Sequence, residues 1–322
     1  ERTTFGFDGP IDLVMGITPD VAESLLRILG PLEAGDRRFD VDNVRDTLQY
    51  EVEVGYASEG IPYDDRKRIL GDLVSRVREA LFTLPPSQWP TLASALSNMQ
   101  TQKQLLVYSS NGETAKALHA IAWDGAIIPK TQDTLLVVDA NLASLKTDPV
   151  VKLSIRYTFA TSADGWVGTV AVRYEHMGTF DWKTTRYRTY TRVFVPEGSR
   201  LLHVEGALAN DLRQNPSGTI AGGEQGSELG LTTFGAFTSI EPGETRDLLF
   251  TFALSPQVIS AIEQGRYDLT VFKQPGASNH SLTLHLDFGK KLRSAHPGEV
   301  FEKWGDTAYD VETRLDQDLL FT

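Results

Sequence analysis

Three short stretches of the sequence carry charged side chains at spacings that could bind a ligand. The first contains Asp65, Arg66 and Lys67, at the start of a predicted helix. Arg66 and Lys67 could hold an anionic sugar phosphate, because arginine and lysine compensate phosphate charge. The same residues also fit an ordinary first helical turn, where the helix dipole favours acidic side chains. We favour the second interpretation.

The second stretch follows the apolar residues 135–138 and contains Asp139, Asn141, Lys146 and Asp148. A lysine flanked by aspartates can form an ion-pair network that fixes a domain boundary. It can also line a ligand cleft, because binding sites favour domain interfaces. We expect a structural role, since Asn and Asp side chains commonly hydrogen-bond turns.

The third stretch is TRYRTYTRVFV, residues 185–195, which reads as a strand. Strand alternation puts Arg186, Arg188, Tyr190 and Arg192 on one face. That face could dock a neutral or acidic glycan, with Tyr190 as a stacking surface. More often such a ladder pairs with carboxylates on neighbouring strands, and this is the interpretation we favour.

Metal and nucleophile chemistry have weak support in the sequence. The chain has no cysteine, which excludes thiolate ligands and thiol nucleophiles. Glu51 and Glu53 could hold a divalent cation together with Asp64 or Asp65, but they lack the fixed spacing of a calcium loop. We predict no catalytic residue, no metal site and no cofactor, with magnesium as the alternative.

The composition limits the possible partners and the number of domains. With 322 residues, of which 41% are hydrophobic, the chain predicts two domains. A net charge of −12 argues against nucleic acid and anionic membrane surfaces as main partners. The chain opens ERTTFGFDGP, with neither an initiator methionine nor a signal peptide, so we expect a processed or truncated fragment.

The first 145 residues alternate strand-like and helix-like patterns, which predicts an α/β domain. A strand over 11–17 precedes a helix that Thr18 caps and Gly30 ends. If upstream strands are missing, the sheet would keep an edge that requires a partner. The remaining predicted elements are helices over 42–52, 64–84 and 89–99, a strand over 104–110, and a helix capped by Ser110 and Glu113.

Residues 146–322 change to a period of two, which predicts an antiparallel, immunoglobulin-like β-sandwich. The glycine-rich segment 216–230 reads as an exposed loop, and an edge strand is expected after Ala295. The predicted strands cover residues 150–159, 165–176, 185–196, 200–206, 230–240, 246–255, 266–274 and 281–289.

Two segments of the sequence are similar to a bacterial family. They are DTLLVVDANLASLKTDPVVKLSIRYTF (133–159) and YRTYTRVFVPEGSRLLHVEG (187–206). They resemble the family called domain of unknown function 4012. GPIDLVMGITPDVAESLLRILGPLEA (9–34) is similar to its central segment, so the resemblance covers most of the chain. Members resemble cell-envelope proteins, which implies an extracytoplasmic location and contact with the membrane only through a missing amino-terminal anchor.

The first half is also similar, more faintly, to the LytR-CpsA-Psr phosphotransferases, which attach glycopolymers to the bacterial cell wall. This resemblance implies their α/β fold, truncated at the amino terminus, with Asp65, Arg66 and Lys67 as the retained part of the site. Where those enzymes carry arginines, this chain reads LQYEVEVGY, residues 48–56. Glu51 and Glu53 there would repel a pyrophosphate.

Together these observations predict a non-catalytic module of the cell surface that binds or organises glycopolymer. Its expected partner is a cell-wall polysaccharide or a polyprenyl-linked glycan. The alternatives are a glycopolymer phosphotransferase, and an adhesion or assembly protein. The candidate ligand-binding residues are Asp65, Arg66, Lys67, Asn141, Lys146, Asp148, Arg188 and Tyr190.

Overall fold

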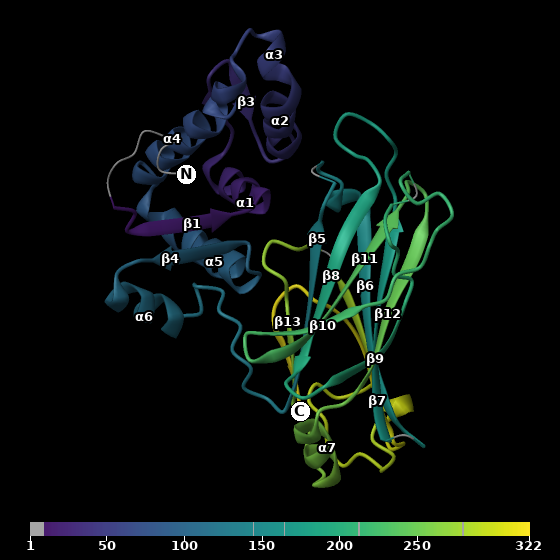
Figure 1. Ribbon diagram of the computed structural model, residues 1–322. Helices are drawn as coiled ribbons and strands as arrows, with labels where there is room; N and C mark the ends of the chain where they lie inside the picture. Colours follow the sequence, from purple (N-terminus) through teal and green to yellow (C-terminus); the bar gives the residue numbers. More distant parts are fainter. Residues whose placement is uncertain (1–9, 144, 164, 212, 279) are drawn as a thin grey trace. The chain divides into compact units, whose positions relative to one another are not determined.

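The computed structural model describes residues 10–143, 145–163, 165–211, 213–278 and 280–322. It divides into two compact units, Glu1–Ala126 and Ile127–Thr322, which we call the helical unit and the sandwich (Figure 1). The sequence prediction places this boundary between residues 145 and 146. The difference arises because residues 133–141 form a central strand of the sandwich, so they cannot belong to the preceding unit.

Helices dominate the described part of the helical unit, and its strands form two-stranded antiparallel sheets. Helix α1 begins after Thr18 and ends before Gly30, as predicted. The helix after β4 is capped by Asn111 rather than Ser110, since the Asn111 side chain accepts the backbone N–H groups of Glu113 and Thr114. The elements are β1 Leu13–Ile17, α1 Pro19–Leu29, β2 Leu32–Ala34, β3 Arg37–Phe39, α2 Val44–Tyr50, a π-helix Glu51–Gly55, α3 Tyr56–Ser58, α4 Arg68–Phe82, α5 Trp89–Thr101, β4 Leu105–Ser109 and α6 Gly112–Ala120, with short 3₁₀ turns at Tyr63–Asp65 and Pro86–Gln88.

Two small apolar clusters hold the helical unit together. One gathers Leu26, Phe39 and Leu73 from α1, β3 and α4, and the other gathers Val21, Met99 and Leu105. The apolar side chains of β1 remain about half exposed. Among the described helices of the whole chain, none is long and apolar enough to cross a membrane.

The second unit consists of two six-stranded sheets that lie face to face (Figure 1). The strand orders are β10-β11-β8-β5-β13-β16 and β15-β14-β6-β7-β12-β9. Side chains from both sheets form one buried cluster, which includes Leu135 of β5, Val172 of β7 and Phe234 of β11. The elements are β5 Asp133–Asn141, β6 Val151–Ser162, β7 Gly165–His176, β8 Tyr187–Pro196, β9 Arg200–Glu205, β10 Glu224–Glu228, β11 Leu231–Ile240, β12 Thr245–Ala253, α7 Pro256–Glu263, β13 Leu269–Phe272, β14 Ser281–Asp287, β15 Ala308–Arg314 and β16 Leu319–Phe321, with 3₁₀ turns at Asp148–Val150 and Phe301–Lys303.

The sheets depart from the predicted antiparallel pattern in two places. Strand β5 pairs with β13 in parallel, and β6 pairs with β14 in parallel. The segment 216–230, predicted to be a loop, contains strand β10, whose residues are all exposed and which pairs with β11. Its strand conformation follows from that pairing, since the sequence EQGSE has no apolar alternation.

One end of the sandwich gathers several of the predicted functional residues. The strand registers place the end of β5, the start of β6, the end of β7 and the start of β8 at this end. Three connections therefore meet near the start of β8. These are residues 142–150 between β5 and β6, residues 177–186 between β7 and β8, and residues 206–223 between β9 and β10.

Candidate functional site

Strand β8 alternates between buried and partly exposed residues, as its sequence predicts. The inward face carries Tyr187, Thr189 and Thr191, which are buried. Each outward residue has a carboxylate partner, so the structural interpretation of this ladder agrees with its contacts. The pairs are Arg186 with Glu241 at 2.7 Å, Arg188 with Asp211 at 3.0 Å, Tyr190 with Glu224 at 2.9 Å and Arg192 with Glu228 at 2.7 Å.

The start of β8 borders a hollow of about 170 Å³, which we call the arginine pocket. Three of its lining side chains, Arg186, Arg188 and Arg213, are cationic, and Asp211 is acidic. The predicted residue Arg188 thus belongs to the site, whereas Tyr190 does not line it. The full lining is Ala143, Thr185, Arg186, Arg188, Asp211, Arg213 and Gln214.

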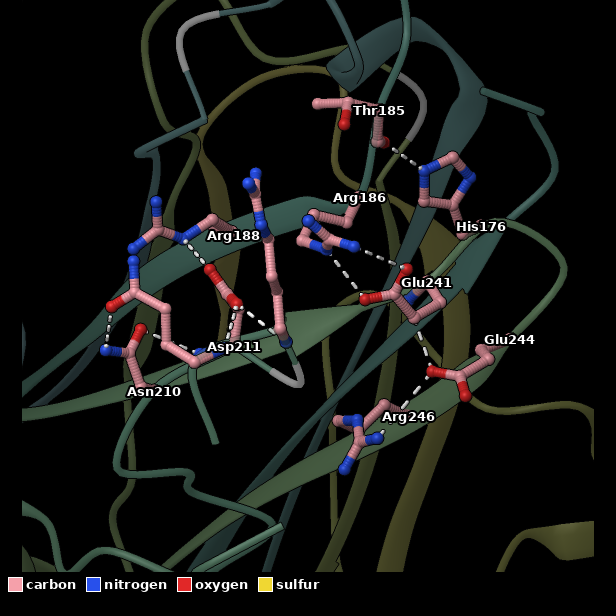
Figure 2. A network of polar contacts seen from close by, with 11 residues as sticks. His176, Thr185, Arg186, Arg188, Asn210, Asp211, Glu241, Glu244 and Arg246 are labelled. Carbon is pink, nitrogen blue, oxygen red and sulfur yellow. Dashed lines mark hydrogen bonds and ion pairs between the residues drawn. The ribbon is translucent and has the colours of Figure 1, made fainter. Parts of the chain in front are cut away.

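Asp211 organises one side of this pocket, as Figure 2 shows. Its side chain is buried, and one carboxylate oxygen accepts the backbone N–H groups of Arg213 at 2.9 Å and Gln214 at 3.1 Å. The other oxygen lies 3.0 Å from Nε of Arg188. Asn210 adds a hydrogen bond from its amide to the side chain of Gln214 at 2.8 Å. The carboxylate therefore fixes the loop that carries Arg213 and forms an ion pair with Arg188, whose buried Nε has no hydrogen-bond partner among the described residues.

Arg186 is held on the other side of the pocket by Glu241. Nε donates to one carboxylate oxygen at 2.7 Å and a terminal nitrogen donates to the other at 3.4 Å (Figure 2). This pairing raises the pKa of Arg186 above its ordinary value. Glu241 is itself held at its backbone, because its N–H donates to the carboxylate of Glu244 at 3.1 Å. Arg186 is thus a fixed positive charge at the pocket wall.

The β5–β6 connection supplies another part of the wall, through two predicted residues. The amide of Asn141 donates to Asp148 at 2.8 Å and to the carbonyl oxygen of Leu145 at 2.9 Å. Its oxygen accepts the N–H of Ala143, which lines the pocket, at 2.9 Å. Asn141 and Asp148 therefore position the wall without lining the pocket themselves.

Asp139 lies behind this wall in a closed hydrogen-bonded cluster. Its carboxylate accepts from Tyr174 at 2.9 Å, from Tyr187 and from Thr189, and Tyr187 also lies 3.1 Å from Asp148. Burial raises the pKa of Asp139 despite these bonds. Because tyrosine and threonine hydroxyls donate to the buried carboxylate, the cluster satisfies it internally and has a structural role.

Lys146 connects two loops of the sandwich through its backbone N–H group. Its N–H donates to the carbonyl oxygen of Lys183 at 3.0 Å, which joins the β5–β6 connection to the β7–β8 connection. Among described residues, its side chain forms no hydrogen bond or ion pair. The ion-pair network predicted for Lys146 with Asp139 and Asp148 is therefore absent from the described structure, and Tyr187 links those two aspartates instead.

The helical unit contains a second hollow, of about 90 Å³, which we call the charged pocket. Asp65 and Arg66 line it together with Arg37, Arg68 and the buried Glu51. Glu51 begins the π-helix, an irregularity that is frequent at functional sites. Lys67 precedes α4, is exposed and does not line this pocket.

The acidic residues of the charged pocket do not suit a magnesium ion. Glu51 and Glu59 both pair with Arg37, at 2.7 Å in the case of Glu51, and these pairs raise the pKa of Arg37. A guanidinium in that position repels a cation. Glu53 is exposed, and within the described ranges no group of three or more His, Asp or Glu side chains could hold a metal ion.

Several residues of the arginine pocket have no signal in the sequence. Asp211 and Arg213 lie in a connection without periodicity, and its shape comes from Asn and Asp side chains that bind nearby backbone N–H groups. Thr185 is placed by the buried His176, whose Nε2 lies 2.8 Å from the Thr185 carbonyl oxygen. A run of Asn and Asp residues after Gly206 is the one hint of an ordered loop there.

Comparisons with known proteins identify no family. No protein-family model matches the chain, and no curated protein matches it. Among solved structures, a Legionella pneumophila protein described as nutrient-binding is similar over 59% of this chain and 70% of its own, with 8% identity and a TM-score of 0.31.

Two further solved structures show likenesses of the same low level. The M1 zinc metallopeptidase of Deinococcus radiodurans matches with 9% identity and a TM-score of 0.25, over 53% of this chain and 42% of its own. The leukotriene A4 hydrolase of Saccharomyces cerevisiae matches with 7% identity and a TM-score of 0.30, over 54% of this chain and 28% of its own. Likenesses at these TM-scores carry no conclusion about fold family or activity.

Proposed function

We propose that the chain is a non-catalytic, extracytoplasmic module that binds an acidic cell-surface glycopolymer through the arginine pocket. The observation that carries this proposal is the convergence of Arg186, Arg188 and Arg213 on one hollow. Carboxylate and phosphate groups match the forked N–H donors of arginine, which can bind two oxygens at once. The proposal includes an immunoglobulin-like fold for the sandwich and a LytR-CpsA-Psr-like fold for the helical unit.

The contacts of the three arginines favour binding over a purely structural role. Arg186 is oriented by two hydrogen bonds to Glu241, and Arg188 is held near Asp211 by an ion pair, so little side-chain entropy is lost when an anion binds. The Arg213 side chain forms no hydrogen bond or ion pair with another residue of the described ranges, so its donors remain available to a ligand. The hollow of about 170 Å³ has room for several water-sized groups.

The net charge of the chain narrows the class of anion. A charge of −12 repels a polyanion that comes within about the Debye length of the surface, which is about 8 Å at physiological ionic strength, because charges farther apart are screened. A densely charged polymer such as nucleic acid is therefore disfavoured. A glycan whose acidic groups are spaced along a neutral backbone can place one group in the pocket with less repulsion elsewhere.

Binding of polygalacturonate that is methyl-esterified on most of its sugars, so that the free carboxylates are spaced along a neutral chain, tests the proposal. The fully methyl-esterified polymer, called the esterified polymer below, is the neutral control. We expect the acidic polymer to bind and the esterified polymer not to bind in isothermal titration calorimetry. Arg213→Gln should weaken binding at least about tenfold, because a hydrogen bond to a charged group contributes about 1.5–3 kcal/mol. Arg188→Gln should do the same, although it also leaves the buried Asp211 with one partner fewer.

Arg200→Gln is the matched control, since Arg200 is an exposed arginine of the same unit that does not line the pocket. It should leave the affinity within about twofold of the unsubstituted protein. Equal binding of the acidic and esterified polymers would contradict the proposal. So would equal affinities for Arg213→Gln and Arg200→Gln.

The phosphotransferase alternative has one observation in its favour. Asp65 and Arg66 lie at the charged pocket beside Arg37 and Arg68, which could hold a sugar phosphate, although five carboxylates also line this pocket. A pyrophosphatase and glycan-transfer assay, run with and without magnesium, separates the two functions. Activity that disappears when Asp65, Arg66 and Lys67 are all changed to Ala would favour the enzyme.

A further inference from the structure

The connection between β7 and β8 exposes three large apolar side chains in a short stretch. We call residues 177–184 the aromatic loop. Met177 is 63% exposed, Phe180 59% and Trp182 45%. Single exposed apolar residues are ordinary, but grouped ones rimmed by polar residues are typical of interaction sites. Neither the predicted strands nor the arginine pocket accounts for these three side chains.

Both ends of the aromatic loop are fixed by one buried side chain. His176 is 2% exposed, and its Nδ1 accepts the backbone N–H of Gly178 at 3.1 Å. Its Nε2 therefore carries the proton and donates to the carbonyl oxygen of Thr185 at 2.8 Å (Figure 2). The imidazole ring thus closes the base of the loop.

The tip of the loop is fixed as well. The carboxylate of Asp181 accepts the backbone N–H groups of Lys183 at 2.8 Å and Thr184 at 2.7 Å. The Lys183 carbonyl oxygen accepts the N–H of Lys146, which ties the tip to the β5–β6 connection. The aromatic side chains are therefore presented from an ordered backbone, which reduces the entropy lost on binding.

The aromatic loop leads directly into the arginine pocket. Thr185, which follows the loop, lines the pocket, and so does Arg186. The guanidinium carbon of Arg186 lies 5.7 Å from the centre of the Phe180 ring. An apolar surface and a cluster of arginines are thus adjacent, and a ligand that satisfies both must combine an apolar face with an anionic group.

We propose that the aromatic loop and the arginine pocket form one composite site for an acidic sugar residue within a glycan chain. The arginines hold the carboxylate or phosphate of that residue, and Phe180 and Trp182 pack against the C–H face of a sugar ring. This inference rests on the proposed function, because it names the ligand class of the same pocket. A polyanion without rings would use the arginines alone.

Short ligands that separate charge from ring shape test the composite site. The probes are trigalacturonic acid, which has both features, and the triglutamate peptide, which has only the charge. We expect the double change of Phe180 and Trp182 to Ala to weaken the binding of trigalacturonic acid at least about tenfold, as is usual when aromatic anchors are truncated. Triglutamate affinity should stay within about twofold.

Phe301→Ala is the matched control. Phe301 is an aromatic residue of the sandwich that is 89% exposed, and the β14–β15 connection that carries it lies at the opposite end of the sheet from His176. It should leave both affinities unchanged. Trp182→Phe retains a ring, so it should keep trigalacturonic acid binding within about threefold while removing any ligand-induced change in the fluorescence of Trp182.

The outcomes distinguish this inference from the proposed function. If the unsubstituted protein binds neither probe, the proposed function fails and the composite site fails with it. If it binds both probes and the alanine variant binds them equally well, the composite site alone is overturned. Loss of binding to phosphatidylglycerol vesicles in that variant, with trigalacturonic acid unaffected, would also overturn it and assign the loop to a lipid surface.

Discussion

Asp133 places a carboxylate inside the core of the sandwich, and tyrosine hydroxyls surround it. It is 1% exposed, and one oxygen accepts from Tyr157 at 2.8 Å and from Tyr267 at 2.6 Å. The other oxygen accepts the backbone N–H of Thr134 at 2.7 Å. Burial raises the pKa of Asp133 to about 6, since these hydrogen bonds offset only part of the desolvation.

This raised pKa predicts a loss of stability as the pH rises. The folded state binds the proton more tightly than the unfolded chain, so the contribution is full below about pH 4 and is lost as the pH passes about 6. The difference corresponds to about 3 kcal/mol. Asp133→Asn mimics the neutral acid, so its stability should not fall with this ionisation. Urea unfolding should therefore show that the free energy of unfolding of the variant, relative to that of the unsubstituted protein, rises by about that amount between about pH 4 and about pH 7.

Other groups titrate in both proteins, so the difference between the two stability curves isolates Asp133. Parallel curves across that range would show that the carboxylate ionises in the folded state without a penalty. Of these contacts, the sequence shows none. Asp133 is one of many acidic residues, and its burial depends on Tyr267, which is distant in the chain.

Among the connecting elements, residues 206–223 deliver Asp211 and Arg213 to the arginine pocket. The segment starts at Gly206, which has φ of 82°. A Cβ atom placed there would lie 2.0 Å from the carbonyl oxygen of Asp247, at the start of β12. Gly206 is therefore required both by its backbone conformation and by the closeness of the neighbouring strand.

Gly206→Ala should destabilise the sandwich by about 3 kcal/mol or more, as strain at positive φ and overpacking each contribute about 1–3 kcal/mol. Gly218→Ala is the control. Gly218 also has positive φ, but open space surrounds its Cβ position, so about 1 kcal/mol is expected. Urea unfolding of both variants measures the difference, and equal losses would contradict the contact with Asp247.

At this scale the sequence predicts regular elements better than connections. Alternation identifies β8 and the outward position of Arg188, because period two follows directly from strand geometry. The positions of Arg213 and the aromatic loop cannot be predicted from the sequence, because the side chains of Asp211, His176 and Asp181 accept backbone N–H groups and so determine the local backbone. Strand β10 is not predicted either, because its pairing with β11 outweighs its weak β-strand propensity.

For the whole molecule, the position of β5 decides what can fold alone. Strand β5 lies between β8 and β13, and its Leu135 and Val137 belong to the shared core. The sequence prediction assigns β5 to the preceding domain because the apolar run 135–138 is followed by turn-forming residues. A continuous apolar run is equally typical of a strand buried on both faces.

Two fragments test this placement. The fragment 127–322 should fold, with the circular dichroism of β-structure and a cooperative unfolding transition. The fragment 146–322 lacks β5, which separates β13 and β16 from the rest of their sheet. Leu135, Leu136 and Val137 contribute about 5–9 kcal/mol by burial. Together with two lost strand pairings, this loss is comparable with the usual net stability of a domain, about 5–15 kcal/mol, so the fragment should be unfolded. A folded 146–322 fragment would contradict the central position of β5.

The two parallel strand pairs also set the order of events during synthesis. Asp133 of β5 lies opposite Leu269 of β13, and Ile155 of β6 lies opposite Leu282 of β14. At about 5–20 residues per second, the ribosome supplies these partners on the order of ten seconds after the strands they join. Until then one edge of β5 and one edge of β6 expose unpaired backbone groups. Each newly made chain therefore passes through an interval in which a chaperone or a neighbouring nascent chain can reach those edges first.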